Sequence, residues 1–131
     1  MGRLLLVLLA LASGAVWGES PRTVAGARTI DSEQARDLFE QGVAFIDVRK
    51  DIDWSAGRIP HAVHLELRHH FAPERLRRAA GRNEPVVFYC NGPECPRSSM
   101  AARRAVGWGY RQVYYYRAGF PAWRNAGYPV E

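Results

Sequence analysis

The chain has 131 residues, 47% of them hydrophobic, and a formal net charge of +5. This is the composition of one ordinary globular domain with a single core, and nothing in it indicates a second domain. Lys50 is the only lysine among 18 basic residues. A basic surface can attract small anions, but a solvated basic face is the simpler interpretation.

The first 18 residues differ in kind from the rest. Arg3 precedes an apolar stretch from Leu4 to Ala12, and small or turn-forming residues follow up to Gly18. This order is typical of a secretory signal peptide over 1–18. The apolar stretch is only nine residues long, whereas a membrane-spanning helix needs about 20, so we expect no permanent membrane anchor. An uncleaved signal anchor is the alternative. The sequence therefore predicts a periplasmic or secreted protein.

A lead-in segment and a helix are predicted next. Residues 19–28 carry scattered charges without periodicity, and we interpret them as a flexible lead-in to a domain over 29–131. Asp31 or Ser32 can cap a helix, and Gln34 completes a capping box with Asp31. A glycine after this apolar stripe ends the helix.

Short apolar runs then alternate with helical patterns. Strands are predicted over 43–48, 62–65, 86–89 and 113–116, and helices over 73–80, 98–106 and 121–125. The stretch between the first two strands is predicted to consist of turns. Such an alternation is typical of an α/β fold, in which helices cover both faces of a parallel sheet. Functional sites in these folds form at the carboxyl ends of the strands.

Both cysteines directly follow the predicted strand 86–89. Cys90 stands at its end and Cys95 five residues later, before the helix predicted from Ser98. A helix N-terminus stabilises a nearby thiolate, and Arg97 at this junction also favours the anionic form. The same main-chain N–H groups can bind an oxyanion of sulfur or phosphorus. Cys90 is therefore a candidate nucleophile.

A disulfide is the default state of two cysteines in an exported protein. A bridge from Cys90 to Cys95 would close a loop of only six residues, which contributes about 2 kcal/mol on the loop-entropy model and connects nothing distant. A structural bridge normally does more. A disulfide and a free reactive thiol both stay open at this point.

Four segments of the chain, in this order, match the signatures of one known family. They are Phe45–Arg49, a strand ending in Asp-Val-Arg; Asp53–Ala62, with Gly-Arg-Ile-Pro-His-Ala; Cys90–Ser98, the loop with its cysteine; and Arg117–Trp123, with its glycine, aromatic residue and tryptophan. Together they resemble the rhodanese family of sulfurtransferases. The resemblance covers most of the chain after residue 18.

The resemblance implies a fold and a chemistry. The fold is a three-layer α/β domain with a central parallel five-stranded sheet and helices on both faces. In the implied chemistry, the loop cysteine takes sulfur from an anionic donor such as thiosulfate, holds it as a persulfide, and passes it to a thiol or other nucleophile. By position, Cys90 is then the catalytic residue. The implied substrate-binding residues are Asn91, Gly92, Pro93, Glu94, Cys95, Pro96, Arg97 and Ser98.

The resemblance also implies roles for individual residues. The loop amides would cradle the anionic substrate, with Arg97 as its charge partner and Ser98 as the helix cap. Asp47 and Arg49 are expected to be structural and to order the strand end near the loop. We expect no cofactor and no metal. The expected partners are a small anionic sulfur donor and a thiol acceptor, and a partner protein stays open as a further one. We expect a monomer.

The loop departs from the family pattern in three ways. Six residues separate Cys90 from Arg97, whereas the usual sulfurtransferase loop has four and the phosphatase relatives have five. Glu94 adds a carboxylate that opposes an anionic sulfur. Cys95 can attack a persulfide on Cys90 or form a disulfide with it. Two alternatives therefore stay open: a non-catalytic rhodanese-fold module that binds an anion or a partner protein, and a two-cysteine redox protein.

Other features are given structural interpretations. The four histidines lie between 61 and 70, and neither cysteine is spaced to complete a zinc site with them. The basic segment 68–82 contains no aromatic pattern and no known binding motif, so we expect a solvated helix face and no nucleic-acid partner. The aromatic run 114–116 and Trp123 are predicted to fill the core.

Overall fold

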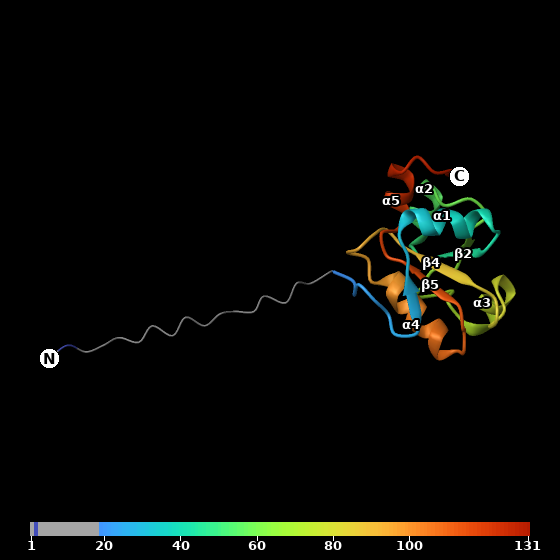
Figure 1. Ribbon diagram of the computed structural model, residues 1–131, viewed down its shortest axis with the longest axis horizontal. Coiled ribbons are helices and arrows are strands. Elements are labelled where there is room, and N and C mark those ends of the chain that lie inside the picture. Colours follow the sequence, from blue (N-terminus) through green and yellow to red (C-terminus); the bar gives the residue numbers. More distant parts are fainter. Residues whose placement is uncertain (1, 3–18) are drawn as a thin grey trace.

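The computed structural model describes Gly2 and residues 19–131 (Figure 1). Apart from Gly2, the predicted signal peptide over 1–18 lies outside the described residues. Among those that are described, no helix has the length and apolar character needed to cross a membrane.

Strands and helices alternate along the described chain. Their bounds are β1 Ala27–Thr29, α1 Ser32–Glu40, β2 Ala44–Asp47, α2 Asp51–Ala56, β3 Val63–His64, α3 Pro73–Ala79, β4 Val86–Tyr89, α4 Arg97–Gly107, β5 Val113–Tyr116 and α5 Gly119–Asn125. The strands form one five-stranded sheet in the order β1-β5-β4-β2-β3, and every pair in it is parallel. This confirms the predicted α/β fold. Figure 1 shows α1, α2 and α5 above the sheet and α3 and α4 below it.

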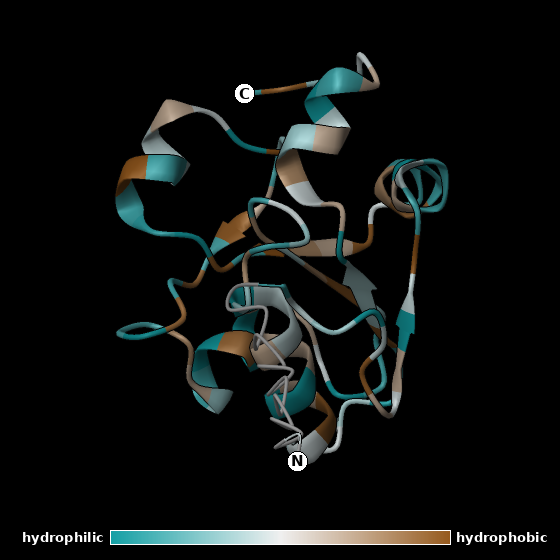
Figure 2. Cartoon of the chain, turned by 90° about the vertical axis from the view of Figure 1, so that its left-hand side faces the viewer, coloured by the Kyte–Doolittle hydropathy of each residue, from teal (hydrophilic) through white to brown (hydrophobic). Residues whose placement is uncertain are grey.

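The central strand β4 divides its side chains between two cores. Val86 and Phe88 lie in the core shared with α3 and α4, whereas Val87 and Tyr89 lie in the core shared with α1 and α5. Successive side chains of a strand point to opposite faces. Cys90, one residue beyond β4, continues this alternation and joins the α4 side. In Figure 2 the apolar strands run between these two helical layers.

Helix α1 begins as predicted. The Asp31 carboxylate accepts a hydrogen bond from the Gln34 amide at 2.8 Å, and the Gln34 side chain accepts one from the Asp31 amide at 3.0 Å. This reciprocal capping box satisfies two main-chain donors of the first turn. The helix buries Ala35 against the sheet.

Part of the segment 19–28, which was expected to be a flexible lead-in, belongs to the sheet. Strand β1 pairs with β5 through Ala27 and Val113, and Val24 is buried in the core. The three residues of β1 are exposed or only half-buried. An edge strand of this kind carries no apolar pattern that the sequence could have displayed.

Helix α2 replaces part of the predicted turn region between β2 and β3. It buries no residue completely, and its N-cap residue, Lys50, makes no side-chain capping bond. A helix without a buried stripe or a cap gives no periodic signal.

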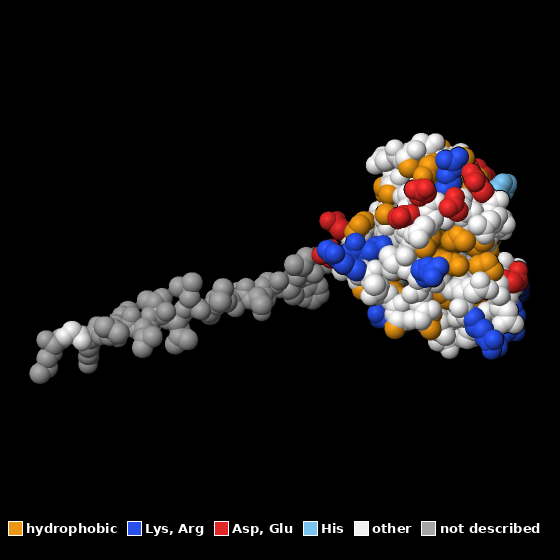
Figure 3. Space-filling model, in the orientation of Figure 1, with side chains coloured by type: hydrophobic (Ala, Val, Ile, Leu, Met, Phe, Trp, Pro, Cys, Tyr) orange, Lys and Arg blue, Asp and Glu red, His pale blue; other side chains and the backbone are white. Residues whose placement is uncertain are grey.

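Charged side chains are unevenly spread over the surface. On the face in Figure 3, acidic residues gather around α1, where Glu33, Asp37 and Glu40 are exposed. The basic residues of α3, Arg75, Arg77 and Arg78, are also exposed. The positive net charge therefore does not form one uniform basic surface.

Candidate active site

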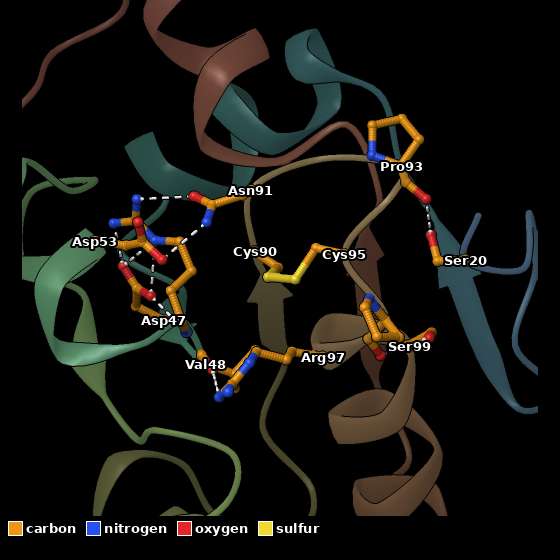
Figure 4. The surroundings of a disulfide bond; sticks show 12 residues. Ser20, Asp47, Val48, Asp53, Cys90, Asn91, Pro93, Cys95, Arg97 and Ser99 are labelled. Atoms are coloured by element: carbon orange, nitrogen blue, oxygen red, sulfur yellow. Dashed lines mark hydrogen bonds and ion pairs between the residues drawn. A yellow bond between two sulfur atoms is a disulfide. The ribbon is translucent and has the colours of Figure 1, made fainter. Parts of the chain in front are cut away.

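Residues 90–96, here called the cysteine loop, connect β4 to α4 at the carboxyl edge of the sheet (Figure 4). Cys90 is 1% exposed and forms a disulfide with the half-buried Cys95. Their Cα atoms are 6.2 Å apart, within the usual range for a disulfide. The sequence left open whether Cys90 is a free thiol or part of a disulfide, and the structure contains the disulfide.

The loop keeps several main-chain donors unused. The Cys95 amide donates to the Gly92 carbonyl oxygen at 3.0 Å. The amides of Asn91, Gly92 and Glu94 have no hydrogen-bond partner within the described part of the chain. Clustered free N–H groups of this kind are the donors that an anion-binding loop requires.

The start of α5 fixes the beginning of the cysteine loop. The Phe120 amide donates to the Cys90 carbonyl oxygen at 2.9 Å. Gly119 has a φ of +69°, and a Cβ there would overlap the Cys90 carbonyl and lie 2.8 Å from the Gly92 nitrogen. Only glycine allows this approach without strain. The closing signature at 117–123 therefore has a physical role, which is to bring α5 against the loop.

A buried ion pair at the end of β2 holds the first residue after Cys90. Arg49 Nη2 lies 2.7 Å from Asp47 Oδ2, and Arg49 Nη1 donates to Asn91 Oδ1 at 3.2 Å. The Tyr89 hydroxyl also donates to Asp47 Oδ2, at 2.7 Å. Burial alone lowers the pKa of Arg49, but the hydrogen bond and the charge of Asp47 raise it above its ordinary value. Burial, together with the Asp47 carboxylate, raises the pKa of Tyr89.

Asn91 extends this network to α2. Its side-chain amide donates to Asp53 Oδ2 at 3.0 Å. The Asn91 side chain thus links two segments of the edge, as Figure 4 shows. The Asn91 side chain is therefore engaged in contacts within the fold, and its main-chain amide is the donor that stays unused.

Arg97, at the start of α4, makes contacts that the sequence did not reveal. In Figure 4 its side chain extends toward Val48, not toward the disulfide. Its Nη1 donates to the Val48 carbonyl oxygen at 3.3 Å and pairs with the Glu66 carboxylate. The positive charge predicted to face an anionic substrate is thus neutralised by a buried carboxylate. Glu66 follows β3 and lies 31 positions away, with no local motif to connect the two residues.

The Glu66 carboxylate is held as an anion by its hydrogen bonds. Burial alone would raise its pKa, but donation from the Arg97 side chain and from the amides of Arg68 and His69 lowers the pKa to about 2. The two amide bonds measure 3.2 Å and 2.8 Å. Glu66 therefore stays ionised and keeps Arg97 in place.

The prediction that Ser98 caps α4 is wrong. The helix begins at Arg97, and Pro96 occupies the N-cap position without a side-chain capping bond. Ser99 Oγ instead donates back to the Pro96 carbonyl at 2.9 Å. Ser98 is 1% exposed, and its Oγ has no partner among the described residues.

The tip of the loop is held from the N-terminal segment. The Ser20 amide and the Ser20 hydroxyl donate to the Pro93 carbonyl oxygen at 2.7 Å and 2.6 Å. The Tyr115 hydroxyl donates to Ser20 Oγ at 3.1 Å. Sequence reasoning missed Ser20 because it precedes Pro93 by 73 positions. Glu94, beside this tip, is exposed, so water and salt screen its carboxylate.

A hollow of about 290 Å³ opens next to Arg97 and Glu66. Its rim includes the exposed cations Lys50 and Arg68 and the exposed His69. In the described part of the chain, no group of three or more histidine, cysteine or acidic side chains is placed to hold a metal ion.

The chain is similar to known proteins in sequence and in fold. The family model of the rhodanese-like domain matches residues 31–126. The thiosulfate sulfurtransferase GlpE of Pseudomonas syringae pv. syringae is 36% identical over 104 residues, which is 79% of this chain and 92% of that protein. A crystal structure of a Bacillus halodurans protein aligns with a TM-score of 0.69 at 21% identity and covers 80% of this chain and 77% of that one. The rhodanese-like domain of an Anabaena protein aligns with a TM-score of 0.67 at 22% identity, over 79% and 77% of the two chains.

Proposed function

Since the chain belongs to the rhodanese-like domain family, we propose that it is an exported sulfurtransferase that carries sulfur as a persulfide on Cys90. The observation that carries this proposal is the position of Cys90. It directly follows the central strand β4 and precedes α4, in a loop with unused main-chain donors. The similarity to GlpE proteins, which are thiosulfate sulfurtransferases, supports the same activity.

The proposed reaction starts from the reduced loop. The Cys90 thiolate attacks the outer sulfur of thiosulfate, the S–S bond of the donor breaks, and sulfite leaves with the bonding electron pair. The product is an anionic persulfide on Cys90. A thiol or another nucleophile then takes the outer sulfur and returns Cys90 to the thiolate.

The residues of the loop have distinct parts in this reaction. The amides of Asn91, Gly92 and Glu94 are the proposed donors to the anionic substrate and persulfide. The buried Ser98 hydroxyl, without a partner among the described residues, is a further donor at the same end of α4. Arg97 acts indirectly, because its contacts with Val48 and Glu66 fix the start of that helix.

A two-cysteine redox protein is the second candidate. The disulfide between Cys90 and Cys95 favours it, because such a pair can cycle between dithiol and disulfide with an external thiol. This candidate predicts exchange with dithiols and no uptake of sulfur.

A pair of single-thiol variants tests the main proposal. Cys90→Ser leaves Cys95 as the only thiol, and Cys95→Ser leaves Cys90. Each protein is reduced, freed of reductant, exposed to thiosulfate and weighed by mass spectrometry. We expect a gain of about 32 Da, one sulfur atom, on Cys95→Ser and no gain on Cys90→Ser. Equal gain on both variants, or gain on Cys90→Ser alone, contradicts the proposal.

Export is a proposal of its own, supported by the charge and apolar pattern of residues 1–18. N-terminal sequencing of the protein recovered from outside the cytoplasm should begin close to Glu19. Recovery of a chain that starts at Met1 contradicts cleavage.

A further inference from the structure

We infer that Cys95 is a resolving thiol, which attacks the Cys90 persulfide, releases hydrosulfide and leaves the disulfide present in this structure. The inference rests on the proposed persulfide chemistry of Cys90. It assigns to the chain a further activity, the reduction of sulfane sulfur to sulfide at the expense of an external dithiol.

The first observation is that the fold brings the two sulfur atoms together. Cys90 and Cys95 are bonded, with a Cα separation of 6.2 Å. Contacts from outside hold the loop at its beginning, tip and end, through Arg49, Ser20 and Glu66 respectively. Because these contacts fix the loop independently of the bridge, we expect Cys95 to stay near Cys90 when the bridge is open.

The second observation is the difference in solvent exposure between the two cysteines. Cys90 is 1% exposed, whereas Cys95 is half-buried. A persulfide on Cys90 therefore has a thiol of the same loop beside it before any acceptor arrives from solution. An oriented intramolecular nucleophile has a large kinetic advantage over a dissolved one.

The third observation is the charge next to Cys95. Glu94 is an exposed carboxylate with no ion pair among the described residues. A negative charge disfavours an anionic persulfide in the same loop relative to a neutral disulfide. Glu94 thus favours resolution, although screening by solvent keeps its effect small.

The step balances as follows. The Cys95 sulfur attacks the inner sulfur of the persulfide, on Cys90, and a Cys90–Cys95 bond forms. The bond between the inner and outer sulfur atoms breaks, and its electron pair leaves with the outer sulfur. That sulfur is reduced to hydrosulfide and receives the proton of the Cys95 thiol. The Cys95 sulfur is oxidised from thiol to disulfide, while the Cys90 sulfur keeps the oxidation level that it had in the persulfide.

An external dithiol closes the cycle. It reduces the Cys90–Cys95 bridge by thiol–disulfide exchange and becomes a disulfide itself. Over one turnover, thiosulfate and a dithiol give sulfite, hydrosulfide and an oxidised dithiol. The proposed acceptor class is a dithiol, because its second thiol resolves the mixed disulfide that its first thiol forms with the loop.

A single-turnover experiment tests the inference. Reduced wild-type protein and Cys95→Ser, both freed of reductant, are mixed with thiosulfate without added thiol. Released sulfide is titrated and the intact mass is recorded. Wild type should release about one sulfide per chain and end as the disulfide, without added sulfur. Cys95→Ser should keep the added sulfur and release at least about tenfold less sulfide. Cys95→Ala should behave in the same way, and thermal unfolding of each variant verifies that it is folded.

The outcomes separate the two proposals. Wild type that keeps the added sulfur overturns the resolving role and leaves the persulfide function standing. Sulfide release that is equal in Cys95→Ser likewise overturns only the resolving role. Added sulfur found on Cys95 of wild type overturns the resolving role and also contradicts Cys90 as the sulfur carrier. Cys95→Ser that takes up no sulfur overturns both.

Discussion

Two arginine–carboxylate pairs hold opposite ends of the cysteine loop in different ways. The pair Asp47–Arg49 is two positions apart in sequence, and its side chains are 0% and 3% exposed. The pair Glu66–Arg97 connects residues 31 positions apart, and its side chains are 7% and 13% exposed. The first pair is sealed under Phe120, whose ring centre lies 4.6 Å from the Arg49 guanidinium carbon. The second pair borders the hollow that contains Lys50 and Arg68.

Because of this difference in burial, we expect the two ion pairs to respond differently to mutation and to pH. Removing one partner of a sealed pair leaves a buried charge that water cannot reach, which is strongly destabilising. At the second pair, the open hollow gives water a route to the guanidinium when the carboxylate is lost. We therefore expect loss of the pair Asp47–Arg49 to cost the most stability, and we expect the pair Glu66–Arg97 to make stability depend on pH.

The largest effect is expected from Asp47→Asn. The change removes the charge that neutralises Arg49 and weakens the hydrogen bond from Tyr89. Loss of one member of a buried pair costs about 3–5 kcal/mol of unfolding free energy. Chemical denaturation at pH 7 measures it. The exposed pair Arg36–Glu40 offers a matched control, because Glu40→Gln should cost at most about 0.5 kcal/mol. Equal losses in the two variants would show that burial does not distinguish the pairs.

A smaller and pH-dependent effect is expected from Glu66→Gln. The pKa of Glu66 falls from its usual 4.5 to about 2 in the folded protein. The unfolded chain therefore binds a proton below about pH 4.5 while the folded chain does not, so stability is lost as the pH falls through this range. The contribution of Glu66 is fully present at pH 7 and amounts to about 3 kcal/mol.

Unfolding free energies of wild type and Glu66→Gln, measured from pH 7 to pH 2, test this sign. The difference between the two unfolding free energies should be about 3 kcal/mol at pH 7 and should become steadily smaller below about pH 4.5. A gap that stays constant down to pH 2 contradicts the assigned pKa.

The sequence predicted the parts of the molecule that depend on local patterns. The apolar runs of β2, β4 and β5 located the central strands, and the pair Asp31 and Gln34 located the start of α1. These signals are local because a strand buried on both faces needs consecutive apolar residues, and a capping box needs two residues three apart. The position of Cys90 at a strand end followed from the same runs.

The parts that escaped prediction depend on contacts between distant residues. Glu66 neutralises Arg97, and Ser20 anchors Pro93, but neither partner has a neighbour in sequence that reveals it. Ser98 was expected to cap α4, yet the helix starts one residue earlier, where the loop and Arg97 place it. Tertiary contacts thus overrode the local capping preference.

Ser20→Ala gives the smallest expected effect and tests the tip of the loop, which Ser20 holds through hydrogen bonds to Pro93. The change removes the 2.6 Å bond from the hydroxyl to Pro93 and one of the two acceptors of the Tyr115 hydroxyl, which keeps its 2.8 Å bond to the Pro21 carbonyl oxygen. The bond from the Ser20 amide to Pro93 also stays. One hydrogen bond of this kind contributes about 1 kcal/mol.

Thr29→Ala is the control, since it removes an exposed hydroxyl bond to the Arg22 carbonyl in the same N-terminal segment. Hydrogen exchange of the Cys95 amide, which bonds to Gly92, should accelerate in Ser20→Ala and stay unchanged in Thr29→Ala. Because the two ion pairs remain in both variants, faster exchange confined to Ser20→Ala would show that the tip is held separately from the ends.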